Sequence, residues 1–186
     1  MKILMLVGST RNEGNSEKLA HLALEGLEYE TIYLKDLDIC PIEDLRHTPE
    51  GFHPVDDDYT QVLEAILESD VLVLATPIYW YSMSGTMKNT IDRFSHAIRD
   101  ERYPHVMEHM KSMKGIVIAV GGDHPRVKGL PLIQQCQYTF DFFDMEFYSY
   151  IIGEARKPGT IMKDVQALMQ AKVLNEKLKA LLTLAE

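Results

Sequence analysis

The chain opens with MKILMLVGSTRNEGNS (residues 1–16), in which the apolar run Ile3–Val7 passes directly into a loop of small and polar residues. The run is continuous rather than alternating, which is typical of a strand covered on both faces in a parallel sheet. It is too short for the core of a signal peptide or for a membrane span, which needs roughly 20 apolar residues. We therefore expect the first strand of an α/β protein here, followed by a functional loop.

Five segments have the composition of short strands. They are Ile3–Val7, residues 28–33, Val71–Ala75, Ile116–Val120 and residues 146–152. Helices are expected between the strands. Apolar residues recur at helical spacing within residues 20–27, 62–67 and 174–185, the last of which ends at Ala185. A further helix is expected over Leu130–Phe142. This alternation predicts an α/β fold with a doubly wound, five-stranded parallel sheet between two layers of helices. Because no linker or repeat interrupts it, residues 1–186 are expected to form one domain.

Composition limits the partners. A net charge of −9 disfavours nucleic acid and anionic membranes, which attract a basic face. Two cysteines, Cys40 and Cys136, cannot make a Cys₄ zinc site or ligate an iron–sulfur cluster, and as reduced thiols they indicate a cytoplasmic protein. The acidic run 56–58 is expected to cap a helix, and no complete ligand set accompanies His105 and His109, so we predict no metal site.

In a doubly wound sheet, ligands bind beyond the carboxyl ends of the strands. The loop after the first strand, Gly8–Ser16, runs into the N-terminus of a helix, where free N–H groups favour an anion. Its candidate phosphate ligands are Ser9, Thr10, Arg11, Asn15 and Ser16. The glycine spacing fits neither a triphosphate-binding P-loop nor a dinucleotide fingerprint. The loop therefore suits a terminal monophosphate, and the alternative is a surface turn capped by Asn15 or Ser16.

The loop after the third expected strand is the second signal. Three adjacent aromatic residues, Tyr79-Trp80-Tyr81, follow Pro77-Ile78 directly, and Ser84-Gly85 then begins a helix. Such a surface can hold a planar heteroaromatic ligand through stacking and backbone hydrogen bonds. The alternative is that these rings cover the end of the sheet or form a subunit interface.

These two segments resemble the NADPH-dependent FMN reductase family of flavodoxin-like proteins, with its multimeric-flavodoxin and iron–sulfur-flavoprotein relatives. The matching segments are Gly8-Ser9-Thr10-Arg11, Gly14-Asn15-Ser16, Pro77-Ile78-Tyr79-Trp80, Ser84-Gly85, Lys88 and Ile91-Asp92-Arg93. The resemblance implies a flavodoxin-like, three-layer α/β/α fold that binds FMN. The residues that it assigns to the cofactor are Ser9, Thr10, Arg11, Asn15, Ser16, Pro77, Ile78, Tyr79, Trp80, Ser84, Gly121 and Gly122. The iron–sulfur relatives carry a cysteine cluster before the second helix, where this chain has Cys40 alone.

The resemblance further implies an NAD(P)H-dependent oxidoreductase that passes electrons to a quinone, nitroaromatic or flavin acceptor. Because the cofactor carries the chemistry, we assign no catalytic side chain. It also implies a homodimer or homotetramer, and small molecules are the only other partners expected. Two alternatives stay open: a flavodoxin-type electron carrier, and a flavin-based redox sensor without NAD(P)H turnover. The roles of the long segment 34–58 and of His124 also stay open.

Overall fold

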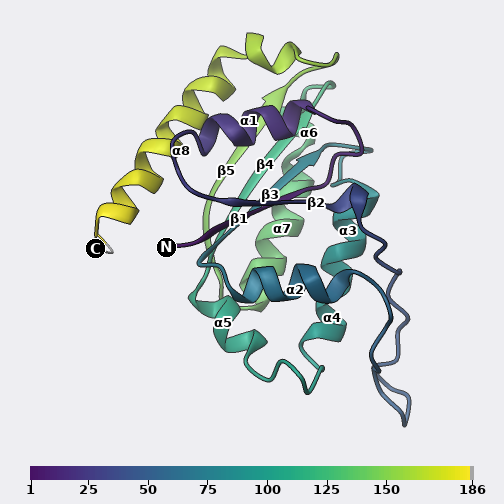
Figure 1. Cartoon of the computed structure of the whole chain (residues 1–186). Helices are drawn as coiled ribbons and strands as arrows, with labels where there is room; N and C mark the ends of the chain where they lie inside the picture. The colour runs from purple at the N-terminus through teal and green to yellow at the C-terminus, as the bar shows by residue number, and fades with distance from the viewer. Residues whose placement is uncertain (185–186) are drawn as a thin grey trace.

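A parallel sheet of five strands, in the order β2-β1-β3-β4-β5, forms the centre of the computed structural model, which describes residues 1–184 (Figure 1). The strands are β1 (Ile3–Val7), β2 (Glu30–Tyr33), β3 (Val71–Pro77), β4 (Lys114–Gly121) and β5 (Glu146–Glu154). All neighbouring pairs are parallel. This strand order is that of the flavodoxin-like fold, so the predicted fold class and all five strands are confirmed.

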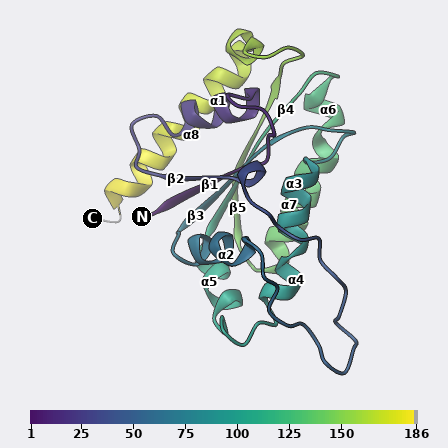
Figure 2. The same ribbon diagram turned by 45° about the vertical axis from the view of Figure 1, so that its right-hand side comes forward.

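Helices cover both faces of the sheet (Figure 2). On one face lie α1 (Asn15–Ala23) and α8 (Val165–Leu184). The other face carries α2 (Tyr59–Leu67), α3 (Gly85–Asp92), α4 (Phe94–Ala97), α5 (Val106–Ser112) and α7 (Leu130–Phe142). Three shorter elements complete the described chain: α6 (Pro125–Lys128) and the 3₁₀ helices η1 (Leu34–Asp36) and η2 (Thr160–Lys163). The predicted α7 is confirmed, whereas Ala185 of the expected C-terminal pattern lies outside the described residues.

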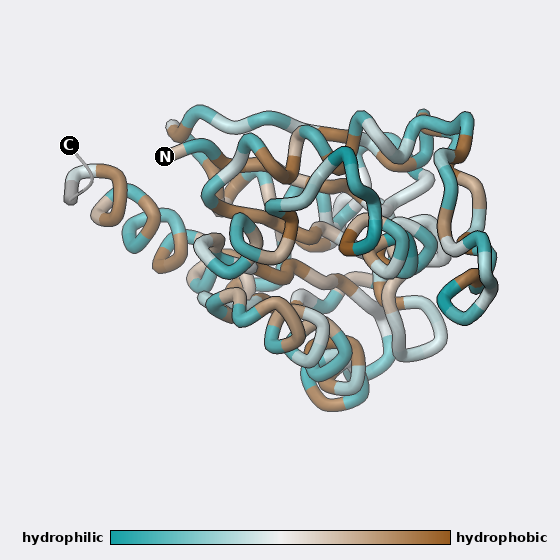
Figure 3. The backbone as a smooth tube through the Cα atoms, turned by 90° about the horizontal axis from the view of Figure 1, so that it is seen from below, coloured by the Kyte–Doolittle hydropathy of each residue, from teal (hydrophilic) through white to brown (hydrophobic). Residues whose placement is uncertain are grey.

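The central strands are apolar on both faces because each face packs into a separate hydrophobic core. In β1, Leu4 and Leu6 belong to the core under α2, α3 and α7, while Ile3, Met5 and Val7 belong to the core under α1 and α8. The hydrophobic stretches of the chain accordingly gather in the middle of the molecule, between helices that alternate in hydropathy (Figure 3). Burial on both faces explains why this strand reads as a continuous apolar run.

The sheet topology also decides where a ligand can bind. The chain passes from β1 to the edge strand β2 and then returns across β1 to β3, so the winding reverses between β1 and β3. Loops leaving the carboxyl ends of strands diverge at such a point and leave a crevice. The loops after β1, β3 and β4 all emerge at this end of the sheet.

The long segment between η1 and α2 runs away from the sheet and returns to it (lower right in Figure 1). A buried ion pair between Arg93 and Asp57 anchors it, and the same guanidinium donates to the Cys40 carbonyl at 3.0 Å. The acidic run before α2 was expected to cap that helix. The N-cap residue Asp58 makes no side-chain hydrogen bond to the helix. Instead, Asp57 Oδ1 accepts a hydrogen bond from the Tyr59 N–H at 3.2 Å, so Asp57 contacts both the first residue of the helix and the anchoring Arg93.

Candidate functional site

A cavity of about 410 Å³ lies at the carboxyl ends of the central strands. Its walls come from the loops after β1, β3 and β4 and from the segment after β5. The lining residues are Ser9, Arg11, Gly14, Asn15, Ser16, Pro77, Ile78, Tyr79, Val120, Gly121, Gly122, Asp123, Ala155 and Arg156. The structure therefore brings together the three loops that the sequence singled out, and it adds a fourth wall.

The wall after β1 is shaped to receive an anion. The Ser9 hydroxyl accepts from the Arg11 N–H at 3.1 Å, which curls the loop, and Glu17 Oε2 accepts from the Gly14 N–H at 3.0 Å. Helix α1 then begins, and its first N–H groups have no acceptor within the helix. The Ser16 side chain is only 2% exposed, and its Oγ has no hydrogen-bond partner among the described residues. A buried hydroxyl without a partner at a helix N-terminus indicates a ligand that supplies oxygens.

Two predicted phosphate ligands are placed differently. The Asn15 amide donates to the Lys157 carbonyl at 3.0 Å, so this group fastens α1 to the segment after β5. Thr10 is exposed and does not line the cavity. The sequence identified the loop correctly as a wall of the cavity, but the contacts of Asn15 depend on a segment 142 residues away.

The wall after β3 carries the aromatic residues. Pro77, Ile78 and Tyr79 line the cavity, while Trp80 and Tyr81 form the tip of a tight turn with φ values of 48° and 66°. Tyr79 and Ser82 close this turn through reciprocal backbone hydrogen bonds of 2.9 and 3.0 Å. Left-handed backbone is costly for bulky residues and is often retained at functional sites. The turn leaves Trp80 93% exposed, on the rim of an adjoining cavity of about 230 Å³.

Ser84 was expected beside the cofactor, but it is buried and is not among the residues that line the cavity. Its Oγ accepts from the Met87 N–H at 3.3 Å and caps α3, and its own N–H donates to Thr76 Oγ1 at 3.0 Å. A Cβ at Gly8 would approach Ser84 Oγ to 2.7 Å, so only glycine allows the first two loops to approach each other this closely. Ser84 therefore positions the two loops and does not line the cavity.

The wall after β4 contributes backbone and one carboxylate. Gly121 and Gly122 line both cavities. Asp123 accepts from Lys128 Nζ at 2.6 Å and from the Tyr81 hydroxyl at 3.1 Å. These two hydrogen bonds, the one from Lys128 first, hold the pKa of Asp123 below its ordinary value. The aromatic turn is thereby tied to the glycine loop.

Sequence reasoning missed the fourth wall, which consists of Ala155 and Arg156. The missed signal was available, because the carboxyl end of the fifth parallel strand faces the same edge of the sheet as the other loops. Arg156 brings a second positive charge to the cavity wall, in addition to that of Arg11. Among residues 1–184, Arg11, Arg99 and Arg156 form no ion pair, whereas Arg46, Arg93, Arg102 and Arg126 each pair with a carboxylate. Of the three unpaired arginines, Arg11 and Arg156 line this cavity. Two free guanidinium groups in an acidic protein indicate an anionic ligand.

The family model described as NADPH-dependent FMN reductase matches residues 1–146. The chain belongs to this family. Over 171 residues it is 50% identical to YwqN of Bacillus subtilis (strain 168), named provisionally as an NAD(P)H-dependent FMN-containing oxidoreductase; the match covers 92% of this chain and 94% of that protein. The enzyme class is thus an NAD(P)H-dependent FMN oxidoreductase, and the cofactor is FMN, as the resemblance implied.

Solved structures agree with the fold. The structure of the Trp repressor binding protein from Bacillus subtilis is 42% identical, with a TM-score of 0.78 over 92% of this chain and 96% of that one. An FMN-dependent NADH-azoreductase from Bacillus anthracis str. Ames Ancestor, solved in complex with FMN, has a TM-score of 0.69 over 96% of this chain and 99% of its own. Because that azoreductase is only 13% identical, it shows the shared fold alone.

The residues around the cavity fit FMN. A partnerless buried hydroxyl, a helix N-terminus and two free guanidinium groups suit its phosphate, and the backbone of the glycine loop beside Tyr79 suits its flat ring. Within residues 1–184, no group of three or more His, Cys, Asp or Glu side chains is arranged to hold a metal ion. None of the helices described is long and apolar enough to cross a membrane.

Proposed function

We propose that this reductase holds the FMN phosphate in the loop Ser9–Ser16 and the flavin ring between Pro77–Tyr79 and Gly121–Gly122. The observation that carries this assignment is the Ser16 hydroxyl, which is buried in the wall of the cavity without a partner. A serine in that environment loses its hydrogen bonds to water and regains one only when an acceptor such as a phosphate oxygen arrives. The nearby Arg11 guanidinium supports the same placement, because it adds positive charge to the same wall.

The residues that line the cavity indicate which tasks belong to the chain and which belong to the cofactor. Bound FMN supplies the redox chemistry, taking a hydride from NADH or NADPH and passing electrons to an acceptor. The chain would bind and orient the ring, and backbone N–H groups beside the ring would favour the negative charge that reduction brings. Among the described residues lining the cavity there is no histidine or cysteine. Besides the two arginines, the ionisable side chains that line it are Tyr79 and Asp123, and the Asp123 carboxylate already accepts hydrogen bonds from Lys128 and Tyr81.

For the acceptor, we propose a flat aromatic molecule: a quinone, a nitroaromatic or a free flavin. The support is the adjoining cavity of about 230 Å³, where Trp80 and Tyr81 meet the glycine loop that both cavities share. Aromatic side chains at the mouth of a site favour planar ligands through stacking and apolar contact. A quinone is the first acceptor to test because it accepts two electrons and needs no further reductant.

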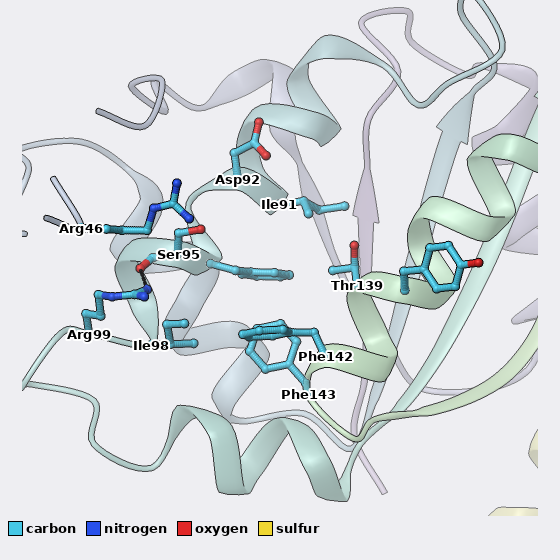
Figure 4. A pocket seen from close by; sticks show the side chains of 11 residues that line it. Arg46, Ile91, Asp92, Ser95, Ile98, Arg99, Thr139, Phe142 and Phe143 are labelled. Carbon is cyan, nitrogen blue, oxygen red and sulfur yellow. Dashed lines mark hydrogen bonds between the residues drawn. The ribbon is translucent and has the colours of Figure 1, made fainter. Parts of the chain in front are cut away.

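We further propose that the chain is one cytoplasmic domain that forms a homodimer or homotetramer. Tyr138 and Phe142 on α7 are each 62% exposed, and Figure 4 shows Phe142 and Phe143 facing Ile98 across a cavity of about 400 Å³. Exposed aromatic residues around an apolar groove are typical of a subunit interface. A second copy would remove these rings from water.

Anaerobic stopped-flow mixing tests the activity. NADH or NADPH should bleach the absorbance of the protein-bound flavin within seconds, and adding a naphthoquinone should restore it. Steady-state rates at varied NAD(P)H and quinone should give parallel double-reciprocal lines, since both substrates use the same open site. A flavin that stays oxidised for minutes with either nicotinamide would instead support the electron carrier.

A further inference from the structure

The segment that follows β5, residues 155–160, joins two walls of the cavity. The Ala155 N–H donates to the Gly121 carbonyl at 2.8 Å, and Arg156 Nε donates to the Gly122 carbonyl at 2.6 Å. On the other side, the Asn15 amide at the start of α1 donates to the Lys157 carbonyl at 3.0 Å. The segment is therefore held both to the proposed ring loop and to the proposed phosphate loop.

Arg156 is fixed within this segment, although it is exposed. A Cβ at Gly122 would approach Arg156 Cγ to 2.9 Å, so the arginine stem lies directly against the glycine backbone. The Nε–H group is used by the Gly122 carbonyl, which leaves the two terminal NH₂ groups free to donate. No carboxylate among the described residues forms an ion pair with this guanidinium, although the sequence holds 28 acidic residues.

We propose that Arg156 is a second guanidinium for the FMN phosphate, acting with Arg11 from a different wall of the cavity; this rests on the phosphate placement proposed above. A phosphate monoester carries a charge of about −1.5 to −2 at neutral pH, which one guanidinium does not balance. The chain has a net charge of −9, so a dianion is repelled by the protein as a whole. Arg11, Arg156 and the N-terminus of α1 together supply the local positive potential, and the buried Ser16 hydroxyl supplies a donor.

The contact with Gly122 defines the competing role. A guanidinium anchored on the ring loop could instead act on the flavin ring, and the phosphate-free analogue riboflavin separates the two roles. A phosphate ligand affects FMN alone, whereas a ring ligand affects FMN and riboflavin equally. Lys157 provides a matched control because it is the neighbouring cation on the same segment and its side chain does not line the cavity.

The experiment is a flavin-fluorescence titration of the apoprotein with FMN and with riboflavin. Arg156→Met keeps an unbranched stem against Gly122 and removes the charge. It should raise the Kd for FMN by about 10- to 100-fold and leave the Kd for riboflavin within about twofold. Arg156→Lys should recover part of the loss, since a lysine keeps the charge without the planar fork. Lys157→Met should change neither Kd by more than about threefold, because it removes only an exposed, solvent-screened charge that does not line the cavity.

The outcomes distinguish a failure of the role proposed for Arg156 from a failure of the phosphate placement on which it rests. If wild-type protein binds FMN and riboflavin equally, the phosphate placement itself is wrong. If wild type prefers FMN and Arg156→Met keeps that preference, only the role of Arg156 is wrong. Equal losses of FMN and riboflavin in Arg156→Met would likewise overturn it in favour of a ring contact or a collapsed segment. An unchanged apoprotein Tm in Arg156→Met, measured alongside, shows that the variant is folded.

Discussion

Arg11 lies in the cavity wall after β1 and forms no ion pair with the described residues. As a surface side chain it would contribute within about ±0.5 kcal/mol to stability, whereas charge-assisted hydrogen bonds to a phosphate contribute about 1.5–3 kcal/mol. Arg11→Ala should therefore raise the Kd for FMN by roughly 10- to 150-fold. The apoprotein Tm should barely move, because the guanidinium has no carboxylate partner to leave behind.

Riboflavin is the control for Arg11, since it should bind wild type and Arg11→Ala almost equally. Arg11→Lys should recover only part of the FMN affinity, because an ammonium cannot reproduce a planar, bidentate contact. Equal FMN dissociation constants for wild type and Arg11→Ala would show that the phosphate lies elsewhere.

Ser16 makes opposite contributions to the apoprotein and to the complex. Its buried hydroxyl has no partner among the described residues, so Ser16→Ala should leave the apoprotein as stable or make it about 1 kcal/mol more stable. The same change should weaken FMN binding by roughly tenfold or more, because a hydrogen bond to a charged acceptor is lost. Thermal unfolding and FMN titration measure the two effects.

Ser69 is a matched control for Ser16. It is also buried, but its hydroxyl donates to the Ala65 carbonyl at 2.7 Å, and it does not line the cavity. Ser69→Ala should therefore lose about 0.5–1.5 kcal/mol of stability and leave FMN affinity unchanged. A Ser16→Ala apoprotein that loses as much stability as Ser69→Ala would mean that the Ser16 hydroxyl has a partner within the protein.

At the scale of elements, the buried cation Arg93, between α3 and α4, anchors the segment between η1 and α2. Arg93 is 2% exposed and pairs with Asp57, and its guanidinium lies 4.6 Å from the centre of the Tyr59 ring. Removing one partner of a buried pair leaves an uncompensated charge, which costs about 3–5 kcal/mol. Arg93→Ala should lower the free energy of unfolding in urea by about that amount.

The exposed pair of Arg46 with Asp44 in the same segment is the comparison. Arg46→Ala should lower the free energy of unfolding far less than Arg93→Ala does, since solvent screens such exposed pairs. Similar losses in the two variants would contradict the idea that Arg93 anchors the segment.

His96 on α4 should make this anchor sensitive to pH. It stacks on Phe52 with ring centroids 5.2 Å apart, and its Nδ1 lies 3.4 Å from Arg93. Burial, and next the charge of Arg93, lower the pKa of His96, although Asp100 and Asp57 act in the opposite direction. The unfolded chain therefore takes up a proton near pH 6.5 while the folded protein does so only at lower pH. Between these two values the unfolded state binds more protons, and stability must fall as pH falls.

Urea unfolding from about pH 7.5 to 5.5 measures how steeply the free energy of unfolding depends on pH. His96→Gln should make this dependence less steep, because residue 96 no longer titrates. An identical slope in His96→Gln and wild type would assign the pH dependence to other groups.

At the scale of the whole molecule, the apolar groove along α7 should decide the oligomeric state. Phe142→Glu places a charge where the proposed second copy would pack, and burying an unpaired charge is costly. Sedimentation or light scattering should show a smaller assembly for this variant. Met169→Glu, on exposed α8 at the other face of the sheet, should assemble as wild type does. Dissociation by Met169→Glu instead would place the interface on α8.

Much of the architecture follows from local sequence, because the spacing of apolar residues indicates helices and strands and shows which of their faces are buried. A strand buried on both faces must be apolar at every position, so runs such as Ile3–Val7 are visible without any tertiary contact. The order of strands and helices then predicts the doubly wound sheet and the edge at which loops converge. Single-turn helices such as α4 and α6 were missed because four residues cannot display a helical period.

By itself, the sequence determined the fold class and identified Gly8–Ser16 and the glycine loop at Gly121 as segments that line the cavity, since each depends on residue types within one short segment. Only the tertiary structure decided that Ser84 does not line the cavity, that the Asn15 amide donates to the Lys157 carbonyl, and that Arg156 supplies a further wall. Those outcomes depend on contacts between segments that are far apart in the chain. Such contacts depend on the path of the backbone and on which polar groups remain unpaired after packing. A local pattern of residue types contains neither piece of information.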